Sequence, residues 1–123
     1  MLSEKEKLEN EFAKLYYDEQ FTPQEKANRI CELFYEDAMK KFNTGLINRQ
    51  LNKCQAWVYE NDEYYYLRSY NTLVAIIYKE CDILIDVLRG VYGYTATSSK
   101  HISKFEHKYG RLNYGCSYRF TYR

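Results

Sequence analysis

The spacing of hydrophobic residues changes from a helical to a strand pattern near residue 54, and this change divides the chain in two. In the first part, apolar residues recur at the spacing of one helix face: Leu8, Phe12, Leu15 and Tyr16, then Ala27, Ile30, Cys31, Phe34, Ala38 and Phe42. Ser3-Glu4-Lys5-Glu6 and Thr22-Pro23-Gln24-Glu25 match capping boxes, the second with proline at the first helical position. Residues 1–45 are therefore predicted to form a helical hairpin.

The second part is predicted to be a sheet organised around residues 72–78, the most apolar run in the chain. Both parities of this run are apolar, which predicts a central strand that is covered on both faces. Strands are expected over residues 54–59, 63–69, 72–78 and 83–88. Their short connections force neighbouring strands to be antiparallel, as in a meander. Residues 46–53 fit either a short helix or a connector.

The C-terminal residues predict one more helix and one more strand. Thr97, Ser98 and Ser99 are candidate N-caps for a helix over residues 99–109, with Gly110 as its C-cap. Residues 114–122 alternate enough for a last edge strand. The predicted fold class is α+β: an N-terminal helical hairpin, an antiparallel meander sheet of four or five strands, and one short C-terminal helix. We expect a single domain over residues 1–123, with the hairpin in 1–45 and the sheet plus short helix in 54–123.

Composition narrows the class of protein. The four cysteines contain no Cys-x-x-Cys pair, which argues against a zinc knuckle, and reduced, mostly buried thiols are expected. No apolar run approaches the ~20 residues that cross a bilayer. The first residues resemble no secretory signal, so we expect a cytoplasmic protein without a membrane partner.

Charge is distributed unevenly along the chain. Residues 1–62 carry 9 basic and 12 acidic side chains, whereas residues 63–123 carry 9 basic and 5 acidic ones. From Arg89 onward, Glu106 is the single acid among seven basic residues. The chain also contains 15 tyrosines, and each buried hydroxyl needs a partner, so some should line a surface. A basic, tyrosine-rich end favours an anionic partner.

Nine residues form the candidate contact surface. Lys100, Lys104 and Lys108 recur every four residues along one side of the expected helix, with Arg111 just beyond. Cations at this spacing can follow phosphates, although a solvated lysine face is the alternative. The other candidates are aromatic or basic residues beside glycines or on the expected edge strand: Tyr92, Tyr94, Arg119, Tyr122 and Arg123. The edge strand can equally serve a homodimer.

Catalysis and metal binding find no support in the motifs. His101 and His107 do not share a helix face, and neither has a cysteine or carboxylate four residues away. Asp82 and Asp86 are expected to be solvated near a turn. The chain contains no nucleophile elbow, phosphate-binding loop or dinucleotide fingerprint. We therefore expect a protein that is no enzyme and holds no metal or cofactor.

Two stretches resemble a small protein family carried by phages and mobile elements of low-GC Gram-positive bacteria. The first stretch covers residues 60–75, in which Ser69-Tyr70-Asn71-Thr72-Leu73-Val74-Ala75 match the family's S-Y-x-T-x-V-A strand. Residues 94–105, Tyr94-Thr95-Ala96-Thr97-Ser98-Ser99-Lys100-His101-Ile102-Ser103-Lys104-Phe105, match its Y-x-A-T-x-x-x-H-x-x-x-F helix. The family pattern marks a fold more than a chemistry, and residues 1–45 lie outside it.

The resemblance implies a small phage accessory protein. Small non-enzymatic proteins in that setting are often inhibitors of host defence, among which anti-CRISPR proteins are prominent. The leading hypothesis is therefore an anti-CRISPR-like inhibitor that binds a host Cas effector such as Cas9 or its guide RNA. Because the net charge is +1, an acidic DNA mimic is disfavoured. The second hypothesis is a stand-alone nucleic-acid-binding accessory or regulatory protein of a mobile element.

Overall fold

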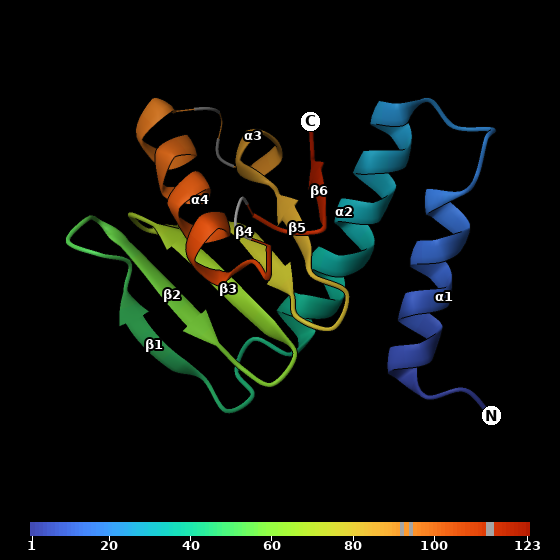
Figure 1. Ribbon diagram of the computed structural model, residues 1–123, viewed down its shortest axis with the longest axis horizontal. Helices are drawn as coiled ribbons and strands as arrows, with labels where there is room; N and C mark the ends of the chain where they lie inside the picture. Colours follow the sequence, from blue (N-terminus) through green and yellow to red (C-terminus); the bar gives the residue numbers. More distant parts are fainter. Residues whose placement is uncertain (92, 94, 113–114) are drawn as a thin grey trace.

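A six-stranded sheet runs through the protein in the order β1-β2-β3-β4-β5-β6 (Figure 1). The computed structural model describes residues 1–91, 93, 95–112 and 115–123. The strands are β1 (Ile47–Gln50), β2 (Ala56–Glu60), β3 (Tyr64–Ser69), β4 (Thr72–Tyr78), β5 (Ile83–Asp86) and β6 (Tyr118–Thr121). β1 to β5 form an antiparallel meander, and β6 pairs with β5 in parallel. The predicted α+β class is confirmed.

Residues 46–53 were predicted to be a short helix or a connector, and this prediction is wrong. The segment contains β1, the first strand of the sheet. All four residues of β1 are exposed, and the strand pairs with β2 along one side only. A polar edge strand buries no face, so it carries no alternation of apolar and polar residues that the sequence could reveal. The antiparallel meander, β1 to β5, therefore has five strands, within the predicted four or five, and β6 is the expected edge strand.

The N-terminal helices have the predicted caps. α1 (Glu4–Tyr16) begins after Ser3, whose hydroxyl accepts the Glu6 N–H at 3.1 Å. α2 (Pro23–Lys40) begins with a complete capping box between Thr22 and Glu25. Together the two helices form the predicted hairpin.

The C-terminal helices differ in detail from the prediction. α3 (Leu88–Val91) is one turn that begins where the strand over 83–88 was expected to end. α4 (Ala96–Tyr109) starts three residues earlier than expected, because Thr95 is its N-cap and accepts the Ser98 N–H at 3.1 Å. Gly110 is the C-cap, as predicted. Of the last strand, residues 118–121 are extended, whereas residue 114 lies outside the described part of the chain.

Helices cover both faces of the sheet. α2, with α1 on its outer side, packs against β4, β5 and β6 on one face, and α4 packs against β3 and β4 on the other (Figure 1). Phe34, Tyr64 and Ile76 belong to the first core cluster, while Leu67, Ile102 and Phe105 belong to the second. From Val74 to Tyr78, β4 is buried, which confirms that it is a central strand.

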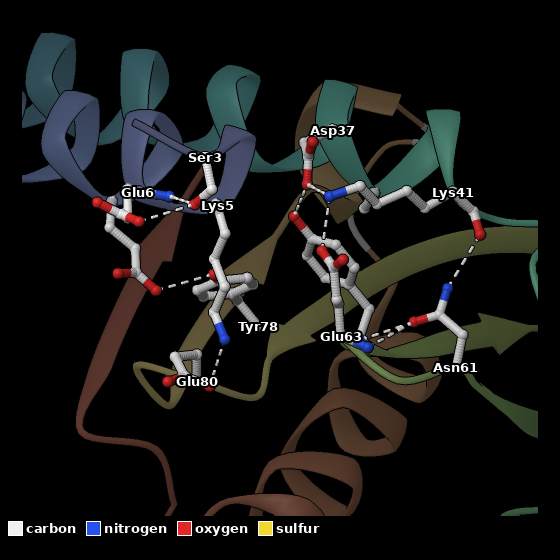
Figure 2. A network of polar contacts seen from close by, with 12 residues as sticks. Ser3, Lys5, Glu6, Asp37, Lys41, Asn61, Glu63, Tyr78 and Glu80 are labelled. Carbon is white, nitrogen blue, oxygen red and sulfur yellow. Dashed lines mark hydrogen bonds and ion pairs between the residues drawn. The ribbon is translucent and has the colours of Figure 1, made fainter. Parts of the chain in front are cut away.

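Buried tyrosines join the hairpin to the sheet, and each hydroxyl finds a partner. Tyr64 donates to Asp37, which is also bonded to Lys41, and Lys41 reaches Glu63 at 2.6 Å (Figure 2). The Tyr78 hydroxyl donates to a glutamate of α1. Part of the tyrosine surplus is thus structural, since three of the tyrosines that the structure describes are completely buried.

Candidate functional site

The outer side of α4 carries the three lysines that the sequence singled out. Lys100, Lys104 and Lys108 are exposed, while Ile102 and Phe105 point from the same helix into the core. None of the three lysines forms an ion pair with any described carboxylate. We call these three residues the α4 basic face.

A buried polar cluster attaches α4 to the end of β3. The Ser69 hydroxyl lies 2.8 Å from the Ser98 hydroxyl and 2.8 Å from His101 Nδ1. All three side chains are at least 95% shielded from solvent. Burial, and then the Lys104 charge, lower the pKa of His101, so the ring stays neutral and serves as a hydrogen-bonding partner. Ser98 was expected to cap the helix, but its hydroxyl instead fixes the helix to the sheet.

The acidic groups of this region point inward, so they do not offset the basic face. Glu106 is buried, accepts the Cys116 N–H at 3.0 Å and pairs with Arg119 at 2.6 Å. Asp82 accepts N–H groups from Arg111 and Ser117. The exposed side of α4 therefore presents positive charge only.

Asp82 and Asp86 were expected to be solvated, and this prediction is wrong because both are buried. Only 3% of Asp82 and 8% of Asp86 is exposed. Asp86 accepts the Leu88 N–H at 3.1 Å and lies 3.5 Å from Arg119. Asp82 ties the C-terminal segment to the β4–β5 hairpin, and Asp86 ties it to β5. Because the partners are distant in sequence, residue spacing could not predict this role.

A second group of cations and rings adjoins the C-terminal end of the α4 basic face. The Tyr109 ring packs on Tyr65 with their centroids 4.7 Å apart, and Lys108 and Arg49 both lie 5.9 Å from the Tyr109 centroid. Lys79 lies 4.5 Å from the Tyr65 centroid. We call these five residues the Tyr109 cluster. No pattern along the sequence predicts this cluster, because its members come from β1, β3, the residue after β4, and α4.

Glu60 holds two of these cations in place. It pairs with Lys79 at 2.6 Å and with Arg49. Burial alone would raise the pKa of Glu60, but the bonds to Lys79 and Arg49 outweigh it and the pKa falls below 4.5. Glu60 therefore stays ionised at neutral pH, and the three side chains carry a net charge of one positive unit.

The other predicted contact residues do not join the α4 basic face. The Arg119 side chain is 42% exposed, but its guanidinium is paired with Glu106 of α4 and Asp86 of β5. Arg111 is exposed, yet its guanidinium donates to the Lys79 carbonyl.

The last two predicted residues contact a different part of the molecule. The Tyr122 ring lies against Gly90 of α3, where an added Cβ would come within 1.8 Å of it. The Arg123 N–H donates to Asn28 of α2 at 3.0 Å. Tyr92 and Tyr94, the remaining candidates, lie outside the described residues.

The described residues contain no group of three or more metal-ligating side chains. No helix among the described residues is both long and apolar enough to cross a membrane. All four cysteines lie in the described part and are free thiols, of which Cys31 is buried and the others are partly exposed.

Fold and surface together define an α+β protein with a basic helix face. The chain belongs to the family of unknown function DUF8033, whose model matches residues 39–120. The match includes all six strands except the last residue of β6, together with α4, and leaves out α1 and nearly all of α2. No curated protein and no solved structure matches the chain.

Proposed function

We propose that this protein is a non-catalytic inhibitor that binds a host nucleic-acid-guided nuclease, such as Cas9, or its guide RNA through the α4 basic face. The observation that carries the proposal is that Lys100, Lys104 and Lys108 are exposed without acidic partners among the described residues, while Glu106 is buried beneath them. Uncompensated cations on one rigid helix attract an anionic partner. The phage setting and the cytoplasm of the host cell are part of this proposal and rest on the sequence resemblance.

The arrangement of the lysines suits a sugar–phosphate backbone. Residues four apart on a helix rise by about 6 Å along its axis. The phosphates of a nucleic-acid strand are also regularly repeated charges, about 3.4 Å apart along the axis of a DNA duplex. Ion pairs with phosphates supply most of the affinity that does not depend on sequence. Guide RNA held by a nuclease presents such a backbone.

The alternative is a nucleic-acid-binding accessory protein that acts alone, and the Tyr109 cluster favours it. Tyr65 and Tyr109 add aromatic surface next to Lys108 and Arg49. Both rings are half-buried against the core, so their remaining exposed area, together with the cations, is what could contact a nucleic-acid strand. This protein would need no nuclease as a partner.

Size-exclusion chromatography separates the two functions. The purified chain is run with guide-loaded Cas9, with guide RNA alone, and by itself. Co-elution with the loaded nuclease but not with free RNA supports the inhibitor. Co-elution with RNA alone supports the stand-alone binder. If the chain elutes unchanged in every mixture, both proposals fail for this nuclease and this RNA.

A further inference from the structure

The hairpin leaves part of one sheet face without a helix. α2 packs against β4, β5 and β6, and Figure 1 shows both hairpin helices at that end of the sheet, away from β1 and β2. Along β2, Ala56 and Val58 face α4, so Trp57 and Tyr59 point to the opposite face, where they are half-buried. This face is distinct from the α4 basic face, which lies on the other side of the sheet.

An arginine lies near two rings on this face, of which Tyr59 also packs against Phe42 with the centroids 5.5 Å apart. Arg68 of β3 is directly opposite Trp57 in the register of β2 and β3. Its Cζ atom lies 4.9 Å from the Trp57 centroid and 5.6 Å from the Tyr59 centroid. Such cation–π contacts orient a guanidinium without using its hydrogen-bond donors. We call Trp57, Tyr59 and Arg68 the Trp57 surface.

The hydrogen-bonding capacity of Arg68 is unmet. Its Nε atom is buried and has no hydrogen-bond partner, and no described carboxylate forms an ion pair with its guanidinium. Buried polar atoms without partners are rare in native proteins and call for an explanation. A charged guanidinium with five donors and no acceptor is an open site for an anion.

The residues around Arg68 add no negative charge. The register places Gln50 of β1 beside Trp57, and Asn48 beside Tyr59. Glu60, the acidic residue of β2, belongs to the opposite face, because it pairs there with Arg49 and Lys79. The surface thus offers one cation, two rings and two amide side chains.

We propose that the Trp57 surface binds a segment of single-stranded nucleic acid. The Arg68 guanidinium takes a phosphate, for which its planar pair of donors is suited. Trp57 and Tyr59 provide aromatic area on which a base can stack. A peptide carboxylate could pair with the arginine but would make no use of the rings. A nucleotide offers a phosphate to the guanidinium and a base to the rings. This site is independent of the α4 basic face and of the nuclease proposal.

The single tryptophan makes the proposal directly measurable. Trp57 is the only tryptophan in the chain, so its fluorescence reports on this surface alone. The full chain is titrated at low salt with oligo(dT) of about ten nucleotides, a length within the range of single-strand sites. Saturable quenching is expected. Arg68→Ala should weaken binding about tenfold or more. Arg68→Lys keeps the charge but loses the planar donors, so its affinity should lie between those of the wild type and Arg68→Ala.

Variants separate this surface from other sources of binding. Trp57→Phe should retain binding, measured by the anisotropy of a labelled oligonucleotide, because a ring remains. Reversal of the three α4 lysines should leave the quenching of Trp57 intact. Circular dichroism establishes that each variant is folded. The proposal would be overturned if the oligonucleotide did not bind. It would also be overturned if the oligonucleotide bound without changing Trp57 fluorescence and bound equally well to Arg68→Ala. Stronger quenching by polyglutamate would overturn it too, and would assign the surface to a carboxylate-bearing protein.

Discussion

Ser69→Ala tests whether the buried cluster under α4 holds that helix on the sheet. The Ser69 hydroxyl is bonded to both Ser98 and His101, so its removal leaves two buried polar groups without a partner. Each such group costs about 1–3 kcal/mol. We expect Ser69→Ala to lower the free energy of unfolding by at least about 2 kcal/mol. Ser98→Ala removes one bond but leaves Ser69 paired with His101, so about 1 kcal/mol is expected.

The double variant makes the test sharper. When both hydroxyls are absent, only His101 Nδ1 lacks its partner, so Ser69→Ala and Ser98→Ala together should cost no more than Ser69→Ala alone. Urea denaturation followed by circular dichroism measures all three free energies, with unchanged m-values as the check on two-state unfolding. Equal costs for the two single variants, or costs that add in the double variant, would show that Ser69 is not the shared partner.

Three further changes probe other parts of the fold. His101 has a folded-state pKa below the ordinary 6.5, so the unfolded chain takes up the proton first as the pH falls. The free energy of unfolding should therefore decline below about pH 6.5, and the difference between the wild type and His101→Asn, measured from pH 7.5 to 5, isolates this decline. Tyr66→Phe removes the buried hydroxyl that donates to the Ala38 carbonyl and accepts from the Asn61 amide, which keeps its bond to the Lys41 carbonyl. The loss should cost about 1–3 kcal/mol in urea denaturation, and no loss would refute the bonding. Gly110→Ala places a Cβ 2.5 Å from the Gly115 backbone, which cannot turn aside as a side chain can, so a loss of about 1–3 kcal/mol and a lower melting temperature are expected, whereas an unchanged one would contradict the contact.

Local signals in the sequence were sufficient for most elements. Both capping boxes, the proline at the start of α2 and the apolar run of β4 each act within a few residues, so they could be recognised without knowledge of the fold. β1 could not be recognised from the sequence, because an exposed edge strand is defined by its pairing with β2 and not by a pattern of its own. The start of α4 was misplaced because Ser98 is an equally good cap by residue type, and only its contact with Ser69 distinguishes the two roles.

The candidate site was predictable in part, for the same reason. Helical spacing predicted the lysines, which are exposed on α4 as expected. Arg119 has the same charge and is partly exposed, but it lies on β6 and its guanidinium is paired with Glu106 and Asp86. The stacking of Arg68 on Trp57 depends on the register of β2 and β3, which residue spacing alone does not determine.

The central claim is that the α4 basic face contacts an anionic partner. The direct test compares two charge-reversed proteins with the wild type: Lys100→Glu, Lys104→Glu and Lys108→Glu on α4, and Lys7→Glu, Lys14→Glu and Lys40→Glu on the hairpin. Both sets change the net charge by the same amount, and all six lysines are exposed. Binding to guide-loaded Cas9 and to guide RNA is measured at several salt concentrations, and circular dichroism shows whether each variant is folded.

The two variants should behave differently. The α4 variant should lose binding and inhibition while it stays folded, and the hairpin variant should keep most of both. For RNA, three lost phosphate contacts should also lower the slope of log affinity against log salt by about 2. Full binding and inhibition by a folded α4 variant would contradict the account, and so would equal losses in the two variants.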